Sequence, residues 1–263
     1  MHPIAFEIAG FPIHWYGLLM AAGLVAGLWT AARRAARIGL SPDLVQEASF
    51  WILIGTLAGA RGWYVATYWK EEFAGGPWTE IFNLRSGGLV FYGGLLGASL
   101  AVAIFARRRR LPLWNLADAL APSIALGHSF GRGGCLMTGC CYGRPTDVPW
   151  RIHFPADHWT KGVGVHPTQI YEMGLNLALF AVLSWRFRHR QFAGQIFGEY
   201  LMAYAVLRAV VEVYRGDYAE RLLVAGLKPG QWVSVAIFIA GTALWTWRRR
   251  APSEGVPAEP KHG

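Results

Sequence analysis

The sequence predicts an all-α polytopic membrane protein with about seven transmembrane helices, and three observations support this fold class. Hydrophobic residues make up 54% of the 263 residues and charged residues only 16%, a composition too apolar for one water-facing domain. Apolar stretches near 20 residues, the length that crosses a bilayer core as a helix, recur along the chain. Arginine clusters follow every second stretch, as is typical of cytoplasmic loops.

Length and apolar composition predict seven candidate membrane spans. They are residues 13–32, 48–68, 89–106, 113–131, 168–185, 195–214 and 230–247. The basic residues that follow the first, third, fifth and seventh spans are Arg33, Arg34, Arg37, Arg107, Arg108, Arg109, Arg110, Arg186, Arg188, Arg190, Arg248, Arg249 and Arg250. Because lysine and arginine collect on the cytoplasmic side, the N-terminus is expected outside and the C-terminus in the cytoplasm.

A single transmembrane domain is expected over residues 1–250, with a disordered cytoplasmic tail over 251–263. The outer-side loop 132–167 is the longest connection, and its Pro, Gly, His and aromatic residues suit the membrane interface. The first ten residues lack the basic region and apolar core of a cleavable signal peptide. The formal net charge is +9, but the basic residues stand beside apolar runs, so membrane lipids rather than nucleic acid are the expected partners.

Charged residues inside the predicted spans indicate either structural ion pairs or a polar cavity, because an unpaired charge in a bilayer costs several kcal/mol. These residues are Arg61, Asp118, His128, Glu199, Arg208 and Glu212, with Arg132 at the end of the fourth span. Glu212 follows Arg208 by four residues, so the two share a helix face and are expected to pair. Several arginines together, Arg61 among them, suit the phosphate of a phospholipid, because guanidinium groups bind phosphate with two hydrogen bonds.

A glycine-rich stretch opens the third span and contains Tyr92. Gly93 and Gly97 are four residues apart, a spacing typical of two closely packed helices. Gly87 and Gly88 precede the span, where exposed backbone N–H groups at a helix N-terminus can hold an anion. The phenol of Tyr92 is expected to face the same polar cavity.

The stretch GRGGCLMTGCCYGRPTD contains all three cysteines of the chain. Cys135, Cys140 and Cys141 lack the second cysteine pair that structural zinc sites usually have, so no metal is expected. A disulfide from Cys135 to Cys140 or Cys141 is compatible with an oxidising outer face. Cysteine also serves as a small buried residue. The sequence leaves these last two interpretations as alternatives.

Taken together, these motifs resemble the bacterial prolipoprotein diacylglyceryl transferase family. The resemblance runs from HWYGLLMAAG to GLKPGQWVS, and its most specific part is GHSFGRGGCLMTGCCYGRPTD. AGARGWYV, SGGLVFYGGLLG, HPTQIYE and YAVLRAVVEVYRGD support it in the family's order. It implies an inner-membrane enzyme with its active site toward the outer side. This enzyme transfers the diacylglyceryl group of phosphatidylglycerol to the lipobox cysteine thiol of a prolipoprotein and releases glycerol phosphate, the first step of bacterial lipoprotein maturation. It implies no metal and no diffusible cofactor.

The resemblance also implies roles for individual residues. Arg132 in GRGG matches the family arginine that binds the phosphatidylglycerol head group. Arg208, with Tyr204 in YAVLR, matches a second essential pair. Tyr16 in HWYG matches a further functional tyrosine, and Gly143 matches the glycine that closes the signature.

One departure from the family concerns the base that takes the thiol proton. Better-studied members have a histidine before the double glycine of the third span, where this chain has Tyr92 in FYGG. A phenol with a pKa of about 10 is a weak base at neutral pH. His128 and His166 are therefore further candidates for the base. A positive cavity that acidifies the incoming thiol is the alternative to a dedicated base.

Two functions of other classes also fit the residues. One is a non-catalytic lipid-binding or lipid-transporting membrane protein that keeps the head-group arginines. The other is a membrane thiol-redox protein built on the three cysteines. Loss of all three cysteines should abolish only the redox function, while Tyr92→Phe should matter to the transferase and not to a lipid-binding protein.

Overall fold

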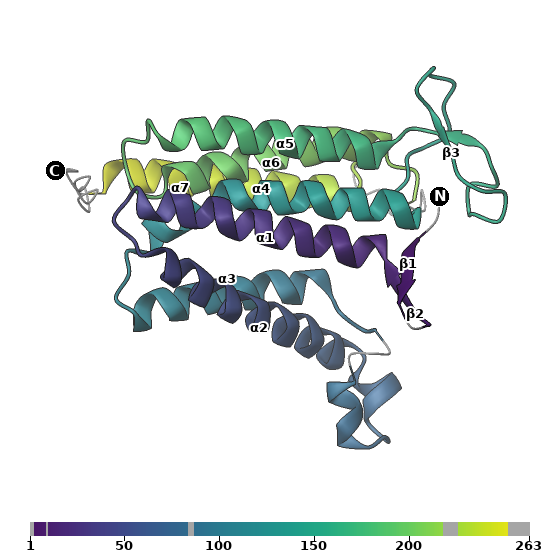
Figure 1. Cartoon of the computed structure of the whole chain (residues 1–263), viewed down its shortest axis with the longest axis horizontal. Helices are drawn as coiled ribbons and strands as arrows, with labels where there is room; N and C mark the ends of the chain where they lie inside the picture. Colours follow the sequence, from purple (N-terminus) through teal and green to yellow (C-terminus); the bar gives the residue numbers. More distant parts are fainter. Residues whose placement is uncertain (1–2, 9, 84–86, 218–225, 252–263) are drawn as a thin grey trace. The chain divides into compact units, whose positions relative to one another are not determined.

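The computed structural model describes residues 3–8, 10–83, 87–217 and 226–251, which are mostly helical (Figure 1). The α-helices in these ranges are α1 Trp15–Ala36, α2 Pro42–Thr67, α3 Phe91–Arg108, α4 Leu113–Thr138, α5 Thr168–Phe187, α6 Gln195–Tyr214 and α7 Pro229–Arg250. Two short antiparallel strand pairs accompany them, β1 Ile4–Ile8 with β2 Phe11–His14 and β3 Ile152–His153 with β4 Gly164–Val165. A π-helical turn, η1 Trp69–Phe73, and a 3-10 helix, η2 Trp78–Phe82, follow α2. The all-α prediction is confirmed.

Each α-helix overlaps most of one of the seven predicted segments, and α6 has the predicted bounds. The structure adds one detail: α4 continues to Thr138, so Arg132 and Cys135 lie on a helix, while the outer-side placement of residues 132–167 stays a prediction. Close packing explains this continuation, because a Cβ atom on Gly134 would lie only 2.7 Å from Cδ2 of Tyr16 on α1. The glycines of GRGG therefore let two helices approach each other.

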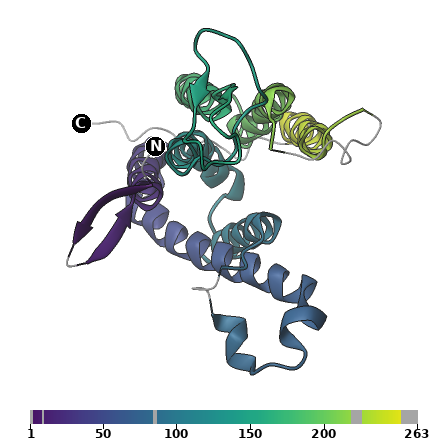
Figure 2. The ribbon, with the colours of Figure 1, turned by 90° about the vertical axis from the view of Figure 1, so that its right-hand side faces the viewer.

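The described part of the chain forms two compact units. One contains the described residues of the ranges 3–34 and 117–251, and the other contains those of the range 35–116. In the first unit α6 packs against α5 and α7 (Figure 2). In the second unit α2 packs against α3. The predicted tail, apart from Ala251, and residues 218–225 between the sixth and seventh predicted spans lie outside the described residues. The limits of the single predicted domain stay a prediction.

Glycines form the contact between α2 and α3. A Cβ atom on Gly55 would lie 2.5 Å from the carbonyl oxygen of Gly97, and one on Gly59 would overlap the carbonyl oxygen of Gly93. Backbones can approach this closely only where neither helix carries a side chain. The interpretation of Gly93 and Gly97 as helix-packing residues is confirmed.

Asp118 shows how a buried charge can serve the fold. Its carboxylate is fully buried, pairs with Nη1 of Arg190 at 3.2 Å and accepts hydrogen bonds from the backbone N–H groups of Gly194 and Phe197 at 2.9 Å each. An acidic group at this position accepts hydrogen bonds from the backbone N–H groups at the start of α6, which have no partner within the helix, and complements the helix dipole. Glu199 likewise pairs with Arg186 at 2.6 Å. The structural interpretation of these two predicted intramembrane charges is confirmed.

Many large apolar side chains are exposed on the outside of the helices, and several polar side chains are buried beside the apolar core. Large exposed apolar residues on the helices include Val25, Trp29, Phe50, Leu100, Val182, Trp185, Val206 and Ile239. Buried polar residues include Asn115, Asp118, Gln169, Glu172, Asn176 and Glu212. Among the described helices, α1 alone is long and apolar enough, by length and composition, to count as a candidate membrane span, with 22 residues and a mean hydropathy of 1.4. Core helices of soluble proteins and signal sequences can meet the same criteria.

Gly59→Ala tests the packing of α2 on α3. The added methyl group overlaps the Gly93 carbonyl, so the substitution should lower the free energy of unfolding by about 1–3 kcal/mol. Gly62→Ala on the same helix is the matched control, since its Cβ would have no neighbour within 4 Å. That change should be neutral or slightly stabilising. The measurement is the unfolding midpoint of the purified protein in detergent, and equal midpoints for the two variants would contradict the packing model.

Candidate functional site

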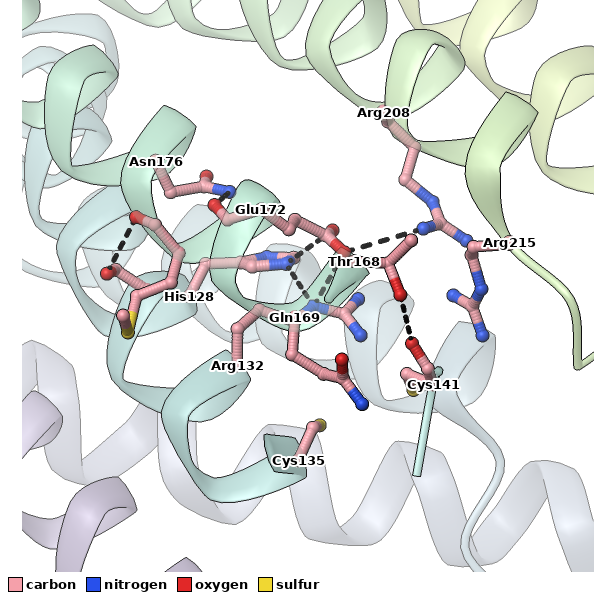
Figure 3. A network of polar contacts seen from close by, with 12 residues as sticks. His128, Arg132, Cys135, Cys141, Thr168, Gln169, Glu172, Asn176, Arg208 and Arg215 are labelled. Atoms are coloured by element: carbon pink, nitrogen blue, oxygen red, sulfur yellow. Dashed lines mark hydrogen bonds and ion pairs between the residues drawn. The ribbon is translucent and has the colours of Figure 1, made fainter. Parts of the chain in front are cut away.

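A buried carboxylate on α5, Glu172, gathers three basic side chains around it (Figure 3). Nε2 of His128 lies 3.0 Å from Oε1 of Glu172. Nε of Arg132 lies 3.0 Å from Oε2, and Nη1 of Arg208 lies 3.7 Å from the same oxygen. His128 and Arg132 come from α4 and Arg208 from α6, so this ion network connects three helices.

The helical repeat places the members of the network. His128 and Arg132 are four residues apart and therefore share one face of α4, where Nε2 of His128 lies 3.1 Å from Nε of Arg132. Tyr204 and Arg208 have the same spacing on α6. The ring of Tyr204 lies against the ring of His128, with centroids 5.4 Å apart. The predicted site residues on α4 and α6 therefore meet.

A second buried carboxylate, Glu212, holds the other side of Arg208. Nη2 of Arg208 lies 2.7 Å from Oε2 of Glu212, which confirms the predicted pair. Gly230 leaves room for this carboxylate, because a Cβ atom there would lie 2.6 Å from Cδ of Glu212. Lys228 donates from Nζ to the backbone oxygen of Glu212 at 2.9 Å. Arg208 is thus held between two carboxylates.

Arg132 is held differently, through one end of its guanidinium. Both of its contacts, with Glu172 and with His128, use Nε. Among the described residues, no hydrogen bond or ion pair reaches its two terminal nitrogens, and Figure 3 shows them pointing away from His128. The side chain is only 15% exposed. Arg132 therefore presents two N–H-bearing nitrogens to a ligand from a largely buried position, the geometry that suits phosphate.

Gly143 joins three segments of backbone. Its N–H donates to the carbonyl oxygen of His166 at 3.1 Å, and the next residue, Arg144, donates from its backbone N–H to the carbonyl oxygen of Tyr214 at 2.8 Å. A side chain at residue 143 would overlap His166. Glycine is therefore required at this position for packing, and the predicted substrate-binding role of Gly143 stays a prediction.

Tyr16 and His166 lie in the same compact unit as the ion network. Tyr16 is 42% exposed and its ring packs on Gly134, near the end of α4. His166 is buried, and its Nδ1 lies 3.2 Å from the hydroxyl of Tyr171. His128, Arg132, Tyr204 and Arg208 are the predicted site residues that the structure brings into direct contact around Glu172.

Arg61 and Tyr92 belong to the other unit, which is described by itself. The guanidinium of Arg61 donates hydrogen bonds to the carbonyl oxygens of Glu80, Ile81, Gly87 and Gly88 at 2.6, 2.8, 3.0 and 3.2 Å. Arg61 thereby closes the loop between α2 and α3. Tyr92 is 50% exposed in the first turn of α3. The predicted roles of both residues in binding and catalysis stay predictions.

Glu172 was missed by the sequence analysis. It ends the motif HPTQIYE and lies five residues into the predicted fifth span, so it was an acidic residue inside the membrane that should have been counted with the other intramembrane charges. Its position beside two arginines and a histidine could not be read from the sequence, since they lie on two other helices.

The chain is similar to proteins of one family along nearly its whole length. The family model described as prolipoprotein diacylglyceryl transferase matches residues 3–247. A phosphatidylglycerol–prolipoprotein diacylglyceryl transferase of Bordetella bronchiseptica is 37% identical over 257 residues, covering 95% of this chain and 97% of the relative. A protein of the same name from Chromohalobacter salexigens is 37% identical over 254 residues, covering 95% and 93%. One from Synechococcus elongatus is 35% identical over 270 residues, covering 97% and 92%.

Glu172→Gln tests the ion network. It removes the buried negative charge and leaves Arg132 and His128 without their carboxylate partner, so it should lower the free energy of unfolding by about 3 kcal/mol. Glu199→Gln is the matched control, because the Arg186–Glu199 pair is partly exposed and should contribute less than about 1 kcal/mol. Unfolding in detergent measures both. Equal small losses would contradict a central role of Glu172.

The buried imidazole of His166 predicts a dependence of stability on pH. Burial lowers the pKa of His166 from its ordinary value of 6.5, and the positive charge of Arg144 adds to the effect. The unfolded chain therefore binds a proton at a higher pH than the folded chain. Stability should be unaffected by this group well above its unfolded pKa and should fall as the pH decreases through that value.

His166→Gln should reduce this loss of stability at low pH, and His189→Gln, which removes an exposed histidine, should leave it unchanged. The measurement is the unfolding midpoint between about pH 5 and pH 8 for the three proteins. The same decline in all three would show that His166 is not the group responsible.

Proposed function

This chain belongs to the prolipoprotein diacylglyceryl transferase family, and we propose that Arg132 and Arg208 bind the phosphate of its lipid substrate between α4, α5 and α6. The family consists of bacterial membrane enzymes, and its reaction is the first step of lipoprotein maturation. The chain is a transferase that uses phosphatidylglycerol and a prolipoprotein as substrates. The acceptor atom that we propose is the thiol sulfur of the lipobox cysteine.

The observation that carries the phosphate site is the free end of Arg132. Its Nε is bound by Glu172 and His128, which fixes the orientation of the guanidinium. The two terminal nitrogens then remain for two hydrogen bonds to a phosphate. A preformed, largely buried guanidinium loses little freedom when the phosphate binds, so its interaction is strong.

The charges of the site also suit a leaving phosphate. Glu172 and Glu212 balance Arg132 and Arg208 before the lipid binds, so neither arginine is an isolated buried charge. When the acceptor sulfur bonds to the glyceryl carbon, the carbon–oxygen bond to the phosphate breaks and negative charge grows on glycerol phosphate. Arginine N–H groups that are already oriented stabilise this charge without reorganisation.

Among the candidate bases, His128 has a carboxylate that orients its ring. When Nε2 of His128 carries the ring proton and donates it to Glu172, Nδ1 is the nitrogen left to take a proton, an arrangement in which a carboxylate orients the imidazole. We propose His128 as the first residue to test, with Tyr92 and His166 as the other two. The ring of Tyr204 fixes the other side of His128.

The proposed topology has seven spans with the N-terminus outside and the C-terminus in the cytoplasm. The seven helices and their exposed apolar side chains support it. In the first unit, α1, α5 and α7 each end in a basic turn, and these ends lie at the left of Figure 1. The segment around β3 lies at the right. Arginine clusters in the last turns of helices are typical of a cytoplasmic side, so the end near β3 is proposed to face outward.

Arg132→Ala tests the phosphate site in a bacterium depleted of its own diacylglyceryl transferase. The wild-type chain should convert a lipoprotein precursor to the lipid-modified form, and Arg132→Ala should slow this conversion by about 100-fold or more. Arg132→Lys should recover part of the rate, because it keeps the charge and loses the second hydrogen bond.

Arg188→Ala is the matched control, since Arg188 is exposed at the predicted cytoplasmic end. It should convert the precursor at the wild-type rate. Normal conversion by membrane-inserted Arg132→Ala would refute the phosphate site, and no conversion by inserted wild type would refute the assigned reaction for this chain.

A further inference from the structure

The three cysteines form a cluster at the end of α4. Their sulfur atoms all lie within 4.8 Å of one another, although the sequence spacing did not suggest a metal site. All three are free thiols in this structure. Three sulfurs bound to one zinc ion at 2.3 Å in tetrahedral geometry would be about 3.8 Å apart. A small contraction of the cluster would reach that separation.

The turn that carries the cluster is held by three side chains. The carbonyl oxygen of Gly139 accepts a hydrogen bond from Nε2 of His158 at 2.8 Å. That of Cys140 accepts from Nε2 of Gln169 at 2.7 Å, and that of Cys141 accepts from Oγ1 of Thr168 at 2.7 Å. Thr168 and Gln169 are each 1% exposed. Three consecutive carbonyl groups are therefore fixed by groups outside the turn.

This fixation keeps the backbone in an unfavourable conformation. Cys141 has a φ of +60°, in the left-handed region that residues other than glycine rarely adopt. Such a conformation persists where the surroundings determine it, most often at ligand sites. Gly139, with a φ of +79°, allows the chain to leave α4. In this conformation the sulfur of Cys141 lies within 4.8 Å of the other two.

Two arginines, Arg132 on α4 and Arg215 directly after α6, lie in the same region as the cluster (Figure 3). The thiolate is the form of cysteine that binds metal ions. Three thiolates with one divalent ion carry a net charge of −1. Basic side chains nearby lower the cost of such a charge, although Arg132 and Arg215 also pair with Glu172 and Asp217. Figure 3 shows Cys141 beside Arg215 and Thr168.

We propose that Cys135, Cys140 and Cys141 bind one Zn²⁺ ion through three thiolates and leave its fourth position open to an incoming thiol. Thiolate ligands select zinc over magnesium, calcium or manganese. Among the described residues the cluster contains only these three ligands. The nearby His158 uses Nε2 on the carbonyl oxygen of Gly139. Three protein ligands and an exchangeable fourth one are typical of catalytic rather than structural zinc.

The open position has a consequence that rests on the proposed function. A thiol that coordinates zinc loses its proton, which here passes to water. The resulting thiolate would attack the glyceryl carbon: the sulfur–carbon bond forms, the carbon–oxygen bond to phosphate breaks, and glycerol phosphate leaves with the electron pair. A chain with tyrosine in place of the family histidine would then activate its acceptor without a strong base. The family resemblance does not predict this site.

The first test measures metal content. The full chain is purified in detergent with a non-chelating reductant, dialysed against Zn²⁺ and then against metal-free buffer, and its zinc is measured by mass spectrometry. Wild type should keep one ion per chain, and Cys135→Ser, Cys140→Ser and Cys141→Ser should each lose at least tenfold in zinc affinity. Thr138→Val is the matched control, because Oγ1 of Thr138 lies 3.4 Å from Sγ of Cys140 and the change removes no sulfur.

A titration of the wild type with Co²⁺ needs no variant and so does not depend on their folding. The titration should reach its endpoint at one Co²⁺ ion per chain, with the absorption that is typical of cobalt bound to thiolates. The proposal would be overturned if the wild-type chain bound neither zinc nor cobalt. It would also be overturned if the protein isolated without reductant contained a disulfide. Zinc kept by all three serine variants would overturn it as well.

The second test concerns the open position and requires no turnover. A short peptide with one cysteine is added to the Co²⁺-loaded chain, and the same peptide with serine is the control. The thiolate-to-cobalt absorption should rise by roughly one third with the cysteine peptide, in proportion to four thiolates instead of three. No response would mean a closed metal site and overturn the open position. A response without lipid transfer to a precursor would contradict the proposed function and leave the zinc site standing.

Discussion

The carboxylate of Glu172 is the interaction on which the polar interior depends. Two arginines and a histidine converge from α4 and α6, and like charges in a low-dielectric interior repel strongly. Glu172 makes this convergence stable, because its two oxygens contact Nε of Arg132 and Nε2 of His128. The contact through Nε also sets the direction in which the guanidinium of Arg132 points. Removing this one carboxylate would disorder the groups that we propose to bind the lipid phosphate. The stability of the bundle and its chemistry thus rest on the same contact.

Helix α5 links the ion network to the cysteine turn. Thr168 and Gln169 in its first turn hold the carbonyl groups of Cys141 and Cys140, and Glu172 follows one turn later. Residues three and four apart on a helix share a face, so one rigid surface positions both groups. The proposed phosphate site and the proposed metal site therefore keep a fixed spacing as long as α5 keeps its place.

The distribution of side chains explains how such a polar interior is tolerated. Many large apolar residues are exposed on the outside of the helices, and buried charges such as Asp118 and Glu212 have partners within the bundle. Glycines bring backbones into contact where α2 meets α3 and where α4 meets Tyr16. In a membrane, where burial of apolar surface does not drive helix association, close packing and paired polar groups are what hold helices together.

The sequence by itself determined the helices, because apolar stretches of sufficient length with arginine at their ends have few other solutions. It also determined the pair Arg208–Glu212, since a spacing of four residues fixes neighbours within one helix. Contacts between helices depend on how each helix is rotated about its axis and how far it is shifted along its neighbours, and no local sequence pattern determines these. Only the tertiary structure therefore showed that α4 continues through Arg132, that Glu172 is the centre of the site, that Arg61 is occupied by backbone carbonyls and that three unevenly spaced cysteines meet.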